Sequence, residues 1–100
     1  MIVFVHTANI NPGRQASALE FAKAVTAHLK QHHDQQVEVL LPVGGNPQRM
    51  AWSSSYKNLA EMEAVRDKLA VDTAYWALLE KYSADFQAGS MNDAIWKTLG

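Results

Sequence analysis

The stretch from residue 48 to residue 79 constrains the fold most, because it joins a strand to a helix with almost no linker. Residues 49–56 combine aromatic and small side chains and predict a strand. Asn58 is a good N-cap for a helix that starts directly afterwards, and Glu61, three residues on, can reach back to the backbone N–H of that capping residue. Apolar residues then recur at helical spacing, so helical structure is expected over residues 59–81.

Apolar periodicity also predicts the remaining elements: strands at 2–8, 37–43 and 93–99, and a helix at 14–31. Phe21, Val25 and Leu29 form the apolar stripe of the first helix, flanked by Ala18 and Ala22, whereas Leu59, Met62, Val65 and Leu69 form that of the second. Asp72 is a further N-cap signal, so the second helix is expected in one or two pieces. Pro42 cannot donate to a ladder, which places strand 37–43 at a sheet edge.

The order of these elements is β-α-β-β-α-β, with Gly44-Gly45-Asn46-Pro47 as a turn between two antiparallel strands. This order predicts one domain over residues 1–100, an α+β ferredoxin-like sandwich. Right-handed crossovers place both helices on one face of a four-stranded antiparallel sheet, with the first and third strands central. The strands are apolar on both faces, so the second face also needs a cover, and a second copy of the sheet is the economical one.

Composition narrows the function classes. Hydrophobic residues make up 48% of only 100 residues, a large apolar load for one small core, which favours a homodimer. The net charge of −1 gives no basic field for nucleic acid or for a membrane surface. The chain has no Cys, which excludes thiol nucleophiles and thiolate metal sites and suits a cytoplasmic location.

Several segments together resemble the dimeric α/β-barrel superfamily. They are Pro12-Gly13 after the first strand, Trp52 to Tyr56 leading into Asn58 to Glu61, Asp72 followed by Tyr75 and Trp76, and Gly89-Ser90 with Ile95-Trp96. The closest resemblance is to small bacterial proteins of the NIPSNAP-like and antibiotic-biosynthesis-monooxygenase-like kinds. It implies two sheets paired into a barrel around a central cleft, and activities ranging from cofactor-independent oxygenation of aromatic compounds to haem degradation or none. Haem-degrading members carry a helix-borne His, and residues 59–81 contain no His.

Two function classes remain open. The first is a small-molecule binding protein, or a monooxygenase-like enzyme without cofactor, that acts on an apolar or aromatic compound in the barrel cleft. The second is a non-catalytic homodimeric structural or stress-associated module whose cleft is filled. A cavity of at least roughly 300 Å³ with polar groups, located between the sheets, would favour the first class.

The candidate base is His6, because it shares a strand face with Ile2 and Phe4 and because imidazole is the side chain that ordinarily exchanges a proton near neutral pH. The alternative is a structural histidine. The candidate ligand-binding residues are Arg49, Trp52, Ser54, Tyr56 and Trp96. Three of these, Trp52, Ser54 and Tyr56, share one face of a central strand and form an aromatic floor with hydroxyl groups, whereas Arg49 points the other way by alternation. Packing between sheets is the alternative for the aromatic residues.

His28 and His32 are four residues apart on the first helix, a spacing that can bind a metal from one face. No acidic residue completes a recognised motif around them. A solvated helix end is therefore the expectation for this segment, with no metal site.

Overall fold

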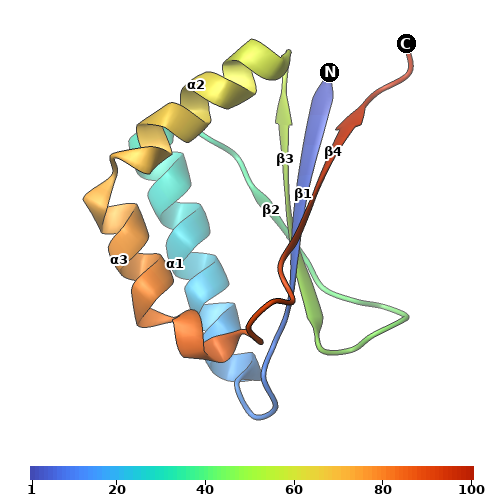
Figure 1. The fold of residues 1–100 in the computed structure, drawn as a ribbon, viewed down its shortest axis with the longest axis vertical. Helices are drawn as coiled ribbons and strands as arrows, with labels where there is room; N and C mark the ends of the chain where they lie inside the picture. Colours follow the sequence, from blue (N-terminus) through green and yellow to red (C-terminus); the bar gives the residue numbers. More distant parts are fainter.

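The computed structural model describes all of residues 1–100 as a sheet with helices on one side (Figure 1). Its elements are β1 Ile2–Asn9, α1 Gln15–His33, β2 Glu38–Leu40, β3 Arg49–Tyr56, α2 Leu59–Ala70, α3 Thr73–Lys81, the short 3₁₀ turn η1 Ser83–Asp85 and β4 Asn92–Lys97. The sheet is antiparallel throughout with strand order β2-β3-β1-β4, so the first and third strands are central. The predicted ferredoxin-like fold is confirmed. No helix combines the length and the apolar character needed to cross a membrane.

Side-chain caps define both helices that follow β3. The Glu61 N–H donates to Asn58 Oδ1 at 2.9 Å, and the Tyr75 N–H donates to Asp72 Oδ1 at 3.1 Å. The second cap starts α3 as a separate helix, so the helical stretch has two pieces. The Glu61 carboxylate also accepts a hydrogen bond, but from the N–H of Lys57 rather than from that of Asn58 as expected.

Strand β2 is shorter than the predicted 37–43. Only Glu38–Leu40 pair with β3, and the strand lies at the edge of the sheet. Pro42 lacks an N–H and restricts the residue before it, so the ladder stops ahead of it. The edge position was predicted correctly and the length was not.

The core lies between α1 and the sheet. Phe21, Val25 and Leu29 are buried, as their spacing predicted, and they belong to one cluster with Ala8, Met50 and Trp52 of the two central strands. The stripe predicted for α2 is only partly correct. Met62 is buried against Ile2 and Tyr56, but Leu59 is exposed because it occupies the first turn of the helix.

The register assigns each strand residue to one of two faces. Phe4 lies opposite Ser54, His6 opposite Trp52 and Ala8 opposite Met50, and this set faces the helices.

Val3 lies opposite both Ser55 and Trp96, and these residues belong to the other face of the sheet. In Figure 1 no helix covers that second face. We call it the open face. It is formed by alternate residues of the four strands, among them Val3, Val5, Thr7, Leu40, Ala51 and Trp96.

Candidate functional site

A cavity of about 360 Å³ lies between the helix-facing side of the sheet and the helices. Hydrophobic residues make up 14 of its 20 lining residues, so its wall suits a mainly apolar molecule. The walls come from every layer: His6 and Trp52 from the sheet, Phe21 from α1, Arg66 from α2 and Tyr75 from α3. The sequence placed the cleft between two paired sheets. In the structure the cavity is instead formed within a single chain, between its sheet and its helices, and is partly open to solvent.

His6 and Asp93 form a polar pair at this cavity. Nδ1 of His6 is hydrogen-bonded to the Asp93 carboxylate, because the two residues face each other across the β1–β4 ladder. The side chain of His6 is 30% exposed, so solvent reaches it. Its ring centroid lies 5.6 Å from that of Trp52. Asp93 fixes the orientation of the ring, while no protein group bonds Nε2.

The mainly apolar wall of the cavity also contains other polar groups. The Ser54 hydroxyl donates to the Tyr56 hydroxyl oxygen at 3.1 Å, inside the core. Burial raises the pKa of Tyr75 above its ordinary value, so its hydroxyl stays protonated at neutral pH. The Arg66 guanidinium lies 5.1 Å above the centre of the Phe4 ring. The buried Trp52 Nε1–H has no hydrogen-bond partner.

The structure brings four of the sequence-predicted site residues together: His6, Trp52, Ser54 and Tyr56 all line the cavity. Arg49 and Trp96 do not. Trp96 pairs with Val3 on the open face, where it is 64% exposed, and Arg49 is exposed at the first position of β3, opposite Asn9.

Sequence reasoning missed Asp93, Arg66 and Tyr75. For Asp93 a signal existed. The predicted topology places the first and last strands side by side, so an acidic residue near the start of the last strand could have been tested as a partner for His6. Tyr75 and Arg66 had no comparable signal, because their position depends on how the two short helices pack.

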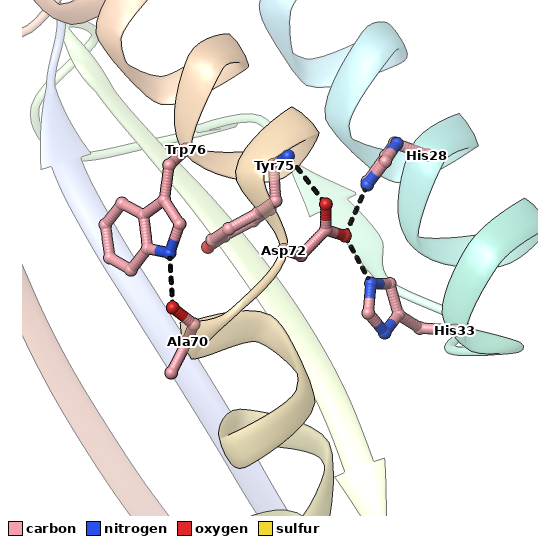
Figure 2. Close-up of polar contacts among 6 residues, drawn as sticks. All are labelled: His28, His33, Ala70, Asp72, Tyr75 and Trp76. Carbon is pink, nitrogen blue, oxygen red and sulfur yellow. Dashed lines mark hydrogen bonds and ion pairs between the residues drawn. The ribbon is translucent and has the colours of Figure 1, made fainter.

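A second polar cluster joins the C-terminal end of α1 to the start of α3 (Figure 2). Nε2 of His28 and Nε2 of His33 lie 2.7 Å and 2.6 Å from the same oxygen, Oδ2 of Asp72. Hydrogen bonds from His33 and His28 hold the pKa of Asp72 well below its usual range. The expected solvated helix end is therefore wrong for His28, whose side chain is 12% exposed, and correct for the exposed His32. The partner, Asp72, is 39 residues beyond His33, out of reach of a local motif search.

The sequence matches no protein-family model and no curated protein. The fold, in contrast, is shared with solved structures over almost the whole chain. An uncharacterised NIPSNAP domain protein from Burkholderia xenovorans superposes with a TM-score of 0.84, covering 99% of this chain and 95% of its own, at 14% identity. A NIPSNAP family protein of unknown function from Agrobacterium tumefaciens gives 0.82, covering 98% and 87%, at 16% identity.

A candidate antibiotic biosynthesis monooxygenase from Nitrosomonas europaea also has this fold. It superposes with a TM-score of 0.75 over the full length of both chains, at 14% identity. Identities this low establish a common fold and no common activity. The expected resemblance to NIPSNAP and antibiotic biosynthesis monooxygenase proteins is confirmed at the level of the fold.

Proposed function

We propose that this chain, folded like the NIPSNAP and antibiotic biosynthesis monooxygenase proteins, binds a flat apolar compound between its sheet and helices and oxidises it without a cofactor. The observation that carries the proposal is the His6–Asp93 pair at a cavity of about 360 Å³. That volume lies within the range of small-molecule sites, and apolar walls with a few polar groups are typical of them. This cavity lies between the sheet and the helices, whereas the alternative structural module was expected to have a filled cleft between two paired sheets.

The residues suit an aromatic substrate with an acidic C–H group beside a carbonyl. Nε2 of His6 takes the proton, and Asp93 stabilises the imidazolium that forms. The electron pair left on carbon forms a C–O bond with molecular oxygen, and the resulting peroxide takes the proton back from His6. Loss of water then leaves a new carbonyl group, so oxygen is reduced to water while the CH₂ group of the substrate is oxidised to C=O.

The aromatic side chains hold the ring in this scheme. Trp52 packs edge-on against Phe21 and Phe86, with ring centroids 6.0 Å and 5.8 Å away, so its indole is a rigid wall. The protonated Tyr75 hydroxyl is a hydrogen-bond donor for a substrate oxygen. Arg66 is the cation for an anionic substituent, in the role that the sequence assigned to Arg49.

We also infer that two copies pair through their open faces. The support is the row of apolar side chains there, which includes Val3, Val5 and the largely exposed Trp96. A monomeric protein rarely exposes a contiguous apolar surface of this kind. The cavity lies on the other side of the sheet, so each copy keeps its own site.

The test compares the parent protein with His6→Ala and Asp93→Asn against phenols, quinones, related aromatic ketones and haem. Thermal shift measures binding and oxygen uptake measures turnover. We expect the parent to bind and oxidise at least one aromatic compound. His6→Ala should keep binding but lose about 10²–10⁴-fold in oxygen uptake, the usual contribution of a general base. The rate of oxygen uptake by Asp93→Asn should lie between that of the parent and that of His6→Ala.

His32→Ala is the matched control, since it removes an exposed histidine that does not line the cavity. It should behave as the parent does. If the parent turns over a compound and His6→Ala does so equally fast, His6 is structural and the catalytic proposal fails. If no compound of the panel shifts the melting temperature, the binding proposal fails with it.

A further inference from the structure

The cluster of His28, His33 and Asp72 has the chemistry of a metal site. Its three donor atoms, two imidazole nitrogens and one carboxylate oxygen, lie within 4.8 Å of one another. Imidazole and carboxylate together suit Zn²⁺ and its neighbours in the first transition series. None of the three residues lines the cavity, so the cluster is separate from the proposed active site.

The carboxylate is oriented before any ion arrives. Oδ1 of Asp72 accepts the hydrogen bond of the Tyr75 N–H that caps α3, which turns Oδ2 towards the two histidines (Figure 2). Both histidines present Nε2 to it from the last two turns of α1. The site is thus assembled from two helices and is fixed by a bond that a metal would not disturb.

The surroundings also favour a cation. No lysine or arginine pairs with Asp72, whose only ion-pair partners are these two histidines. The partial negative charge at the C-terminal end of α1 is opposed by the partial positive charge at the start of α3, which Asp72 caps, so the attraction for a cation comes from the carboxylate itself. The side chains of His28, His33 and Asp72 are 12%, 9% and 16% exposed, so the donors are shielded but open to entering ions.

The donor spacing is close to what zinc requires. Metal–ligand distances of about 2.0–2.1 Å in a tetrahedron separate neighbouring donors by about 3.3 Å. In the structure each Nε2 lies 2.6–2.7 Å from Oδ2, the distance of a hydrogen bond. An ion can replace the two bridging protons once each nitrogen and the shared oxygen move apart by about 0.6–0.7 Å.

We propose that His28, His33 and Asp72 form a zinc site that ties the C-terminal end of α1 to the start of α3, with water as the fourth ligand. The i, i+4 pair seen in the sequence, His28 with His32, is not this site. His32 packs against His28 with its ring tilted and the ring centroids 4.6 Å apart, but it is exposed and bonds nothing in the cluster.

The experiment titrates the chelator-treated protein with ZnCl₂ in a calorimeter and follows the melting temperature. We expect one Zn²⁺ per chain and a rise in melting temperature that EDTA reverses, because a ligand bound only to the folded state stabilises it. Asp72→Asn keeps an N-cap acceptor for α3 and removes the charged donor. Asp72→Asn and His33→Gln should each weaken zinc binding at least about 10-fold, the loss typical even of groups that only support a metal ligand.

His32→Gln is the matched control and should bind zinc as the parent does. If His32→Gln weakens binding as much as His33→Gln while Asp72→Asn leaves it intact, the ion sits on the helix surface and the proposal is wrong. Absence of stoichiometric binding overturns it as well, and then the cluster is a hydrogen-bonded tie alone. Circular dichroism of each metal-free variant separates lost binding from lost folding. None of these outcomes depends on the proposed oxidation.

Discussion

His6 owes its place at the cavity to two features of β1. The alternation of side chains along the strand puts it on the helix-facing side of the sheet, together with Ile2 and Phe4. What it pairs with depended on the exact register of β1 against β4, which brings Asp93 opposite. A shift of one residue would have placed Asp93 on the other face, and no local pattern specifies that register.

Tyr75 gives a prediction for alkaline pH. Burial raises its pKa, so the folded state holds the phenolic proton more tightly than the unfolded state. The resulting stability is fully present below the unfolded pKa of about 10 and is lost as the pH rises through the folded value. Urea midpoints measured from about pH 8 to about pH 11 should therefore fall more steeply for the parent than for Tyr75→Phe. Parallel curves for the two proteins would contradict this assignment.

The helices were the elements that the sequence predicted best, because the signals that start and orient a helix lie within a few residues of one another. The caps at Asn58 and Asp72 and the spacing of Phe21, Val25 and Leu29 are decided within a few residues, and all appear in the structure. Strand β2 was overestimated because the pairing of an edge strand depends on its partner. The sequence predicted four strand residues of the cavity wall but not the position of the cavity, since its other walls are set by how α2 and α3 pack over the sheet.

The stripe of α1 leads to a stability prediction. Phe21 is buried and its ring touches Trp52, Tyr82 and Phe86 at centroid distances of 5.3–6.0 Å. Phe21→Ala should lower the free energy of unfolding by about 3–5 kcal/mol, from lost contacts and the new void. Leu69 is only partly buried and lies beside the cavity. Leu69→Ala should therefore lower the free energy of unfolding by about 2 kcal/mol, the low end of the range for such substitutions.

Leu19→Ala is the control for this measurement, because Leu19 lies on the exposed side of the same helix. It should change the unfolding free energy by no more than about 0.5 kcal/mol. Urea denaturation of the three variants and the parent provides the comparison. A loss for Phe21→Ala as small as that for Leu19→Ala would show that the helix face is wrongly assigned.

For the whole molecule, the open face is the feature that a single chain leaves unexplained. If two copies pair there, sedimentation at about 10 μM should give a dimer, since interfaces of this type reach micromolar affinity or better. Trp96→Lys puts a charge on that face and should weaken the dimer at least about 10-fold. Trp76→Lys, which changes an exposed tryptophan on α3, should leave the dimer intact. If the parent protein sediments as a monomer, the proposed dimer is wrong.

The placement of the three tryptophans gives the molecule a built-in optical probe. Trp52 is buried at the cavity wall, whereas Trp76 and Trp96 are exposed. An indole shielded from water fluoresces at shorter wavelength than one in water, so the blue edge of the emission spectrum originates from Trp52. Because its ring lies beside His6, a molecule that enters the cavity, or protonation of the imidazole, should change the emission of Trp52 before that of the other two tryptophans. Occupancy of the site can therefore be followed without any label.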